Sequence, residues 1–252
     1  MLPEMTVSSR DNLTSRVHQQ LRDSLILGRF WPGQRLRIRE VAAAMGVSDT
    51  PVREAMMQLV REGGLEMRSG QSINVVKLTL ARYLELREIR LLLEGLATEK
   101  ATPNVTPALI AQLEGLHATL IESERSQNYE RAIGVNSEFH FAVYRASRGA
   151  DLIAILEGIW LRNGPLMKLL YPHAAPTYAG RHQHLAIIEG LRDGDAAMAR
   201  RAMQDDSIEG GKWIVALLQR IDRGEAAIVE TDDGRMELKF MPAGAPRLSF
   251  AR

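Results

Sequence analysis

Apolar residues recur every three or four positions near the N-terminus, which is the spacing of an amphipathic helix. The first such stretch, roughly 12–27, carries Val17 and Leu25 on its apolar face and ends at Gly28. Two shorter stretches follow. Gly46 separates them, because glycine enters the left-handed backbone region without strain. The pattern therefore predicts three helices, of which the last two are joined by a tight turn.

The last two of these helices form a predicted helix-turn-helix. The buried stripe of the second helix is Val52, Met56 and Leu59. Ser48 is its predicted N-cap, and Pro51 lies in its first turn, where a missing N–H does no harm. Polar and basic side chains gather at the N-terminal end of this helix. That arrangement is typical of a helix that enters the major groove of DNA.

Two strands are predicted directly after the helix-turn-helix. Residues 65–68 and 73–76 flank the glycine-containing turn 69–72, and this is the pattern of a β-hairpin. Such a hairpin would form the wing of a winged helix. We therefore expect a flexible arm over 1–9 and a winged helix-turn-helix domain over 10–78.

The rest of the chain reads as helices joined by short loops that contain proline or glycine. The predicted helices cover 80–101, 107–126, 129–147, 151–170, 177–193 and 195–222. Short connections favour an antiparallel bundle, which we place at 79–222. The segment 223–252 is expected to be an extended tail with one strand. The predicted fold class is mainly α: an N-terminal winged helix-turn-helix plus a C-terminal antiparallel α-helical bundle.

Composition narrows the class of protein. The chain has 252 residues, no cysteine, and 45% hydrophobic but only 5% aromatic residues. The lack of cysteine excludes disulfides and thiolate metal sites. No apolar run reaches the roughly 18–20 residues of a membrane helix, so we expect no membrane partner. The first 78 residues hold 11 Lys and Arg against 8 Asp and Glu, a modest basic excess that suits DNA.

Several separated blocks of residues 15–78 resemble the GntR family of bacterial transcription regulators. The matching blocks are 27–36, 46–55 and 62–65. The helical remainder, 79–222, is similar to the FCD ligand-binding domain of the FadR subfamily, and six helices are more similar to its VanR-type variant. The marks that carry this second resemblance are weaker: 86–90 with Glu94, Phe139-His140 with Ala146-Ser147, and 184–191.

The resemblance implies a set of DNA contacts. They are Arg39, Ser48, Thr50, Arg53 and the wing-tip Gly70. The guanidinium forks suit phosphate or a guanine edge, and the hydroxyls suit phosphate. The family very commonly has arginine where this chain has Asp49. A carboxylate there could accept from a cytosine amino group or orient a neighbouring arginine, so the preferred operator is expected to differ from that of relatives.

The resemblance also implies a metal pocket. Many FCD domains hold a divalent metal with one Asp and three His, and the matching residues here are Asn136, His140, His184 and Asp206. Imidazole with carboxylate suits Zn, Ni, Mn or Fe, and the amide of Asn136 is a weaker ligand. Two alternatives remain open: an organic acid bound without metal, and a polar cluster in the core. His182 and His173 are expected to be loop or surface histidines.

The expected effector is a small organic acid. Arg90 is the preferred cation for its carboxylate, and the alternative for Arg90 is an outward salt bridge to Glu94. Tyr144 and Arg162 are further candidates for effector binding. Asn163 and Met167 are expected to line the same cavity.

Taken together, these features predict a transcription regulator, of the repressor type, and not an enzyme. It is expected to act in the bacterial cytoplasm as a homodimer on a pseudo-palindromic double-stranded DNA operator. Two other classes stay open: a metal-dependent hydrolase, for which the chain lacks HExxH and G-x-S-x-G motifs, and a non-specific architectural DNA binder.

Overall fold

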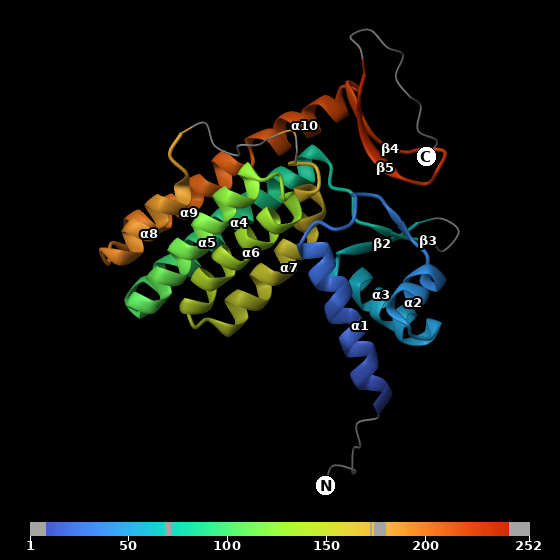
Figure 1. Ribbon diagram of the computed structural model, residues 1–252, viewed down its shortest axis with the longest axis horizontal. Coiled ribbons are helices and arrows are strands. Elements are labelled where there is room, and N and C mark those ends of the chain that lie inside the picture. Colours follow the sequence, from blue (N-terminus) through green and yellow to red (C-terminus); the bar gives the residue numbers. More distant parts are fainter. Residues whose placement is uncertain (1–8, 69–71, 172, 174–179, 242–252) are drawn as a thin grey trace.

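The computed structural model describes residues 9–68, 72–171, 173 and 180–241. Its N-terminal part is a winged helix with a three-stranded antiparallel sheet in the order β1-β3-β2 (Figure 1). The elements are α1 (Ser9–Ile26), β1 (Arg35–Leu36), α2 (Ile38–Met45), α3 (Asp49–Glu62), β2 (Leu65–Arg68) and β3 (Ser72–Val75). The three helices and the wing match the prediction from the sequence. Strand β1 was not predicted, because its two residues pair with β3 at long range and leave no periodic signal.

The turn between α2 and α3 follows from local chemistry. Gly46 adopts a φ of 65°, and its N–H bonds back to the α2 carbonyls. Helix α3 then begins after Ser48 and buries Val52, Met56 and Leu59 completely against the core that α1 shares. The face of α3 opposite this stripe therefore remains free to meet a partner.

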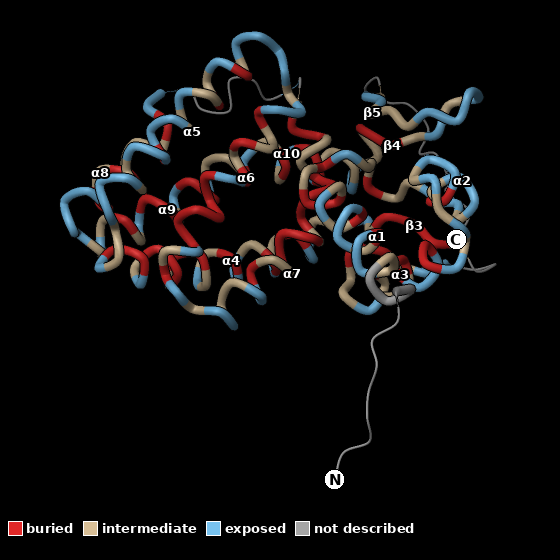
Figure 2. The backbone as a smooth tube through the Cα atoms, turned by 60° about the horizontal axis from the view of Figure 1, so that its bottom comes forward, coloured by how far each residue is buried: buried red, intermediate tan, exposed pale blue. Residues whose placement is uncertain are grey.

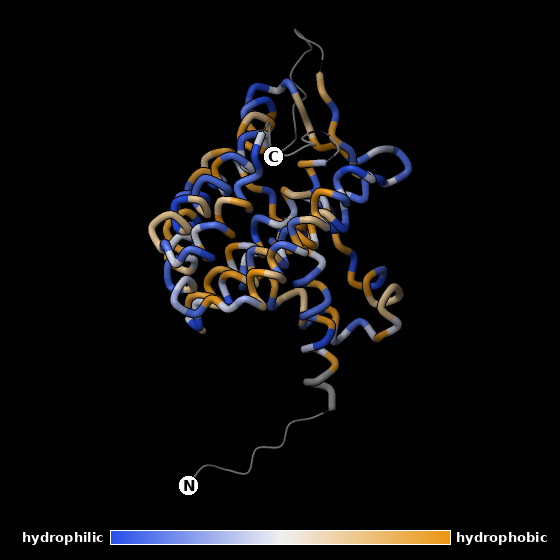
Figure 3. Tube along the Cα trace, turned by 60° about the vertical axis from the view of Figure 1, so that its left-hand side comes forward, coloured by the Kyte–Doolittle hydropathy of each residue, from blue (hydrophilic) through white to orange (hydrophobic). Residues whose placement is uncertain are grey.

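Helices α4 to α9 pack side by side to form the larger part of the molecule (Figure 1). Buried residues lie where these helices face one another (Figure 2), and polar and apolar segments alternate along each of them (Figure 3). None of the described helices is long and apolar enough to cross a membrane. The helices are α4 (Leu80–Ala101), α5 (Pro107–Arg125), α6 (Tyr129–Ala146), α7 (Ala150–Met167), α8 (Gln183–Arg192), α9 (Ala196–Gly210) and α10 (Lys212–Asp222), and a short 3₁₀ helix, η2, covers Thr102–Asn104.

The last predicted helix, 195–222, is in fact two helices that meet at Gly211. A Cβ at Gly211 would lie 2.6 Å from the Tyr83 hydroxyl and 2.9 Å from the Ser207 carbonyl oxygen. Close packing against α4 therefore requires glycine here. The described part of the bundle has seven α-helices instead of the expected six.

The C-terminal segment forms a hairpin instead of a single strand. Strands β4 (Ala226–Glu230) and β5 (Met236–Phe240) pair antiparallel around a turn that contains Gly234, with a φ of 78°. Ala226 and Ile228 are buried in the same apolar cluster as Leu217 of α10. The hairpin thus docks on the bundle, and residues 242–252 lie outside the described part of the chain.

The winged helix and the bundle share one core, which is continuous across their junction. The C-terminal end of α1 crosses α7 at Gly164, where a Cβ would overlap the Leu25 carbonyl oxygen and lie 2.7 Å from the Ile26 Cα. The Arg22 Nη1 also donates to the Glu157 carboxylate over 3.1 Å. Helix α7 therefore fixes the position of α1.

We expect Gly164→Ala to destabilise the protein by about 1–3 kcal/mol, since the added methyl group meets backbone atoms that cannot step aside. Gly158→Ala on the same helix is the control. No described atom lies within 4 Å of its new Cβ, so helix propensity predicts a gain of about 0.5–1 kcal/mol. Urea unfolding of both variants measures the difference. Equal stability of the two variants would contradict this account of the junction.

Candidate functional site

The surface expected to read DNA is formed by α2 and α3. Thr50 and Arg53 are exposed on α3, and the Arg39 side chain at the start of α2 is 94% exposed. Ser48 occupies the N-cap of α3, yet within the described residues its hydroxyl makes no capping hydrogen bond, so it is available to a phosphate. The fifth expected contact, Gly70, lies outside the described residues.

Asp49 lies beside Arg39. Its Oδ2 is 3.9 Å from the Arg39 Nε; the Arg39 side chain is almost fully exposed and the Asp49 side chain is half-exposed. A surface pair of this kind adds little to stability. The Asp49 carboxylate therefore lies beside the Arg39 guanidinium at the N-terminal end of α3.

Polar side chains connect helix α3 to α1 and to α7. Thr14 donates to Glu54 over 2.9 Å, and His18 lies 2.9 Å from Glu62. Arg162 donates to the backbone carbonyl of Glu62 over 3.4 Å and also packs beside Gly63. The expectation that Arg162 lines the effector cavity is therefore wrong: its side chain reaches the junction with α3.

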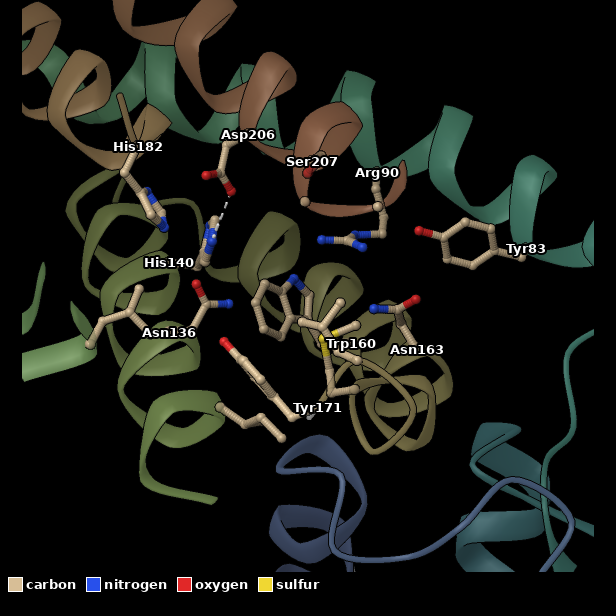
Figure 4. A pocket seen from close by; sticks show the side chains of 16 residues that line it. Tyr83, Arg90, Asn136, His140, Trp160, Asn163, Tyr171, His182, Asp206 and Ser207 are labelled. Atoms are coloured by element: carbon tan, nitrogen blue, oxygen red, sulfur yellow. Dashed lines mark ion pairs between the residues drawn. The ribbon is translucent and has the colours of Figure 1, made fainter. Parts of the chain in front are cut away.

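A cluster of metal-ligand type lies inside the bundle, between α6, α8 and α9. The His140 Nε2 is 3.2 Å from one oxygen of Asp206, and the His184 Nε2 is 3.8 Å from the other. All three residues are buried, and one ligand atom from each lies within 4.8 Å of the others. Asn136 is half-buried on the wall of the same cavity (Figure 4).

Burial lowers the pKa of three histidines in this region, His117, His182 and His184. It lowers the pKa of His184 well below its ordinary value, although the Asp206 charge opposes the shift. It also lowers the pKa of His182 to about 4 and the pKa of His117. Neutral imidazole is the form that binds metal ions. Among the described residues, neither ring nitrogen of His184 has a hydrogen-bond partner, although buried polar atoms are ordinarily satisfied, and this fits a side chain that binds a metal ion.

Tyr144 is fully buried behind His140, and its hydroxyl lies 3.2 Å from the His140 Nδ1. It is not among the residues that line the cavity. The expectation of a direct effector contact is thus replaced by a positioning contact, which directs the opposite nitrogen of His140 toward Asp206.

A buried network around Glu94 forms another wall of the cavity. Arg90 donates to Glu94 over 2.8 Å, Trp160 donates over 2.9 Å, and Ser207 donates over 2.7 Å. Burial alone would lower the pKa of Arg90, but the Glu94 charge and hydrogen bond raise it above its ordinary value. Arg90 therefore points inward, as expected, and at the same time makes the salt bridge to Glu94 that was its alternative.

The cavity has a volume of about 70 Å³. Both Asn163 and Met167 line it, as expected. Tyr83 on α4 and Tyr171, which follows α7, also line it and were not predicted, because a sequence does not show whether an aromatic side chain faces a cavity or the core. His182 was expected at the surface but is 7% exposed and lines the cavity; its Nδ1 accepts a hydrogen bond from the His184 N–H as the N-cap of α8. His173 is exposed, as expected.

A winged helix-turn-helix joined to a helical bundle with a buried polar pocket defines a class: DNA-binding regulators with a ligand-binding domain. Two family models match this division. "Bacterial regulatory proteins, gntR family" matches residues 13–75, and "FCD domain" matches residues 85–206.

Relatives and solved structures agree with these matches. The HTH-type transcriptional regulator McbR of Escherichia coli K12 is 33% identical over 171 residues, which cover 68% of this chain and 77% of McbR. The repressor RspR of the same organism is 29% identical over 206 residues, or 79% and 89% of the two chains. The structure of E. coli McbR/YncC superposes with a TM-score of 0.74 at 27% identity, over 86% of this chain and 100% of that one.

A putative GntR regulator from Rhodococcus sp. RHA1 shares the fold, with a TM-score of 0.67 at 20% identity over 82% of this chain and 98% of that one. The chain belongs to the GntR family of bacterial regulatory proteins and carries a C-terminal FCD domain. It is a DNA-binding transcription regulator, and its family and relatives are regulators, not enzymes.

Proposed function

We propose that this regulator is a repressor whose operator affinity is set by a small organic acid bound next to a divalent metal ion in the FCD domain. The observation that carries the proposal is the buried cluster of His140, His184 and Asp206, with Asn136 beside it. Two imidazoles and a carboxylate suit Zn, Ni, Mn or Fe, and the amide of Asn136 adds a neutral oxygen. We place the protein in the bacterial cytoplasm, where its DNA target lies.

The carboxylate of the effector would bind mainly to the metal ion. Arg90 lines the cavity, but Glu94 already balances its charge, so Arg90 contributes N–H donors more than net positive charge. Asn163 offers an amide on the same wall. A cavity of about 70 Å³ favours a compact acid over a bulky one.

On the DNA side, we propose that Arg53 reads a base edge or phosphate in the major groove and that Ser48 and Thr50 bind phosphate. Arg39 adds a charged contact whose direction Asp49 sets. Gly70 would let the wing approach the sugar-phosphate backbone. The exposure of Arg39, Ser48, Thr50 and Arg53 on the helix-turn-helix supports this part of the proposal.

Two recognition helices on one operator require a dimer. Helices α4 and α7 pack together and carry large apolar side chains that are exposed, namely Ile89 and Leu92 on α4 and Ile155 on α7, with Leu92 at 62%. We propose that a second copy of the chain covers this patch. The two α3 helices would then meet a pseudo-palindromic double-stranded operator.

Helix α7 provides a route from the pocket to the DNA. Trp160, Asn163 and Met167 line the cavity, whereas Arg162 and Gly164 contact α3 and α1. Helix α7 thus lines the cavity with some of its residues and contacts the winged helix with others. A shift of α7 on effector binding would therefore change the position of the winged helix. We propose that the effector favours the arrangement that fits the operator less well.

Chelator-stripped protein is expected to bind one Mn²⁺ or Zn²⁺ per chain in a calorimetric titration. We expect Asp206→Asn to weaken Mn²⁺ binding at least about tenfold, since the substitution removes the carboxylate of the cluster, and loss of even an outer-shell partner of a ligand commonly weakens metal binding by about 10–100-fold. Asp205→Asn is the matched control, because Asp205 is exposed on the same helix. Equal Mn²⁺ affinity of the two variants would contradict the metal site.

A further inference from the structure

A second group of histidines shares His184 with the first. His117 comes from α5, and His182 and His184 come from the N-terminal end of α8. One ligand atom from each lies within 4.8 Å of the others. The ring centroids of His117 and His182 are 5.1 Å apart, and those of His182 and His184 are 4.3 Å apart.

Two members of this group, His117 and His184, carry ring nitrogens without a hydrogen bond among the described residues. In the described part of the chain, the Nδ1 of His117 and both nitrogens of His184 are buried without a hydrogen bond. His184 is 0% exposed and stacks on Phe139, so water does not reach it from outside. Buried polar atoms are ordinarily satisfied, and three orphaned imidazole nitrogens at one place point to an absent ligand that accepts nitrogen donors.

We propose that His117, His182 and His184 form a second metal position, built only of imidazoles, next to the position at His140, His184 and Asp206. Three histidines leave a coordination site open on a tetrahedral ion. Without a carboxylate, the position favours Zn²⁺, Cu²⁺ or Ni²⁺ over Mn²⁺. Because His184 belongs to both positions and is a neutral imidazole, one ion at a time occupies the pair.

Coordination by His182 has a structural consequence. The Nδ1 of His182 accepts the His184 N–H over 3.1 Å and so caps α8. A neutral imidazole that binds metal through one nitrogen carries a proton on the other, so the ring must give up this capping bond. An ion at the second position therefore joins α5 to the start of α8 and replaces the cap that His182 now provides.

The test disables the first position and asks whether the second remains. In full-length Asp206→Asn protein, we expect Zn²⁺ to remain bound in a competition titration with a chromogenic chelator. Adding His117→Ala is expected to weaken Zn²⁺ binding at least about tenfold, as loss of a ligand would. Adding His173→Ala, which removes an exposed histidine outside both groups, is the matched control and leaves Zn²⁺ binding unchanged. Loss of Zn²⁺ binding in Asp206→Asn alone, or equal affinity of the two double variants, would overturn the proposal.

A spectroscopic measurement tests the second position in a protein that still has Asp206. We expect the Cu²⁺ electron paramagnetic resonance spectrum to show three imidazole nitrogens in the wild type and two in His117→Ala. An identical nitrogen pattern in both proteins would also overturn the proposal. Mn²⁺ binding depends on Asp206 and not on His117, and operator binding in the absence of effector depends on neither, so failure of the proposed regulatory site and failure of the second position give different results.

Discussion

Arg53→Ala is expected to abolish specific binding of the operator while the protein keeps its fold. Arg53 is exposed on α3, whose opposite face is fully buried, so its side chain serves an outside partner and not the core. A bidentate contact with guanine is worth about 1–3 kcal/mol, which corresponds to roughly five- to 150-fold in affinity. A gel shift at moderate salt, with an excess of unrelated DNA, measures the loss.

Arg61→Ala is the matched control for this prediction. Arg61 is also exposed and also on α3, but it lies in the last turn, far from the end that enters the groove. We expect its removal to leave operator affinity nearly unchanged, and thermal unfolding to be the same for both variants. Unchanged operator binding by Arg53→Ala would refute the assignment of α3 as the recognition helix.

Glu94→Ala is expected to destabilise the protein by about 3–5 kcal/mol, since it leaves the buried Arg90 guanidinium without its counter-charge. Glu94 is 0% exposed and also accepts hydrogen bonds from Trp160 and Ser207, which would lose their partner together. Urea unfolding monitored by circular dichroism gives the free energy.

Glu88→Ala on the same helix is the control, because Glu88 is exposed and its removal should change the stability by no more than about 0.5 kcal/mol. The double substitution Arg90→Met with Glu94→Leu should recover much of the loss, since replacing a whole buried pair by apolar groups is often neutral. A Glu94→Ala variant as stable as Glu88→Ala would contradict this prediction, because it would show that water solvates the Arg90 guanidinium when Glu94 is absent.

The sequence predicted most of the helices because their apolar residues recur at helical spacing over long stretches. It failed where the signal was short or nonlocal. Strand β1 is two residues long, and its existence depends on pairing with Asn74 and Ile73 far along the chain. The break at Gly211 depends on the approach of Tyr83 from α4, and a helical glycine gives no local sign of such a neighbour.

The pocket could be predicted only in part, and for a similar reason. Resemblance to the FCD domain brought His140, His184 and Asp206 together, although they lie on three helices. His117 was not predicted, and His182 was expected at the surface, because neither has a fixed spacing in the sequence to the other ligands. His182 lies two residues before His184, but this closeness does not show how deeply its side chain is buried. Arg162 lies one residue from Asn163 on α7 but points to the other face, and a helix separates neighbours by about 100°.

The most direct test of the regulator is selection of DNA from a random library by the full-length protein, followed by sequencing. We predict an enriched inverted repeat, bound by the wild-type protein at least about 10³-fold more tightly than unrelated DNA and not enriched by Arg53→Ala. Absence of any enriched sequence, or enrichment of the same sequence by Arg53→Ala, would contradict the claim that α3 of this GntR regulator reads an operator.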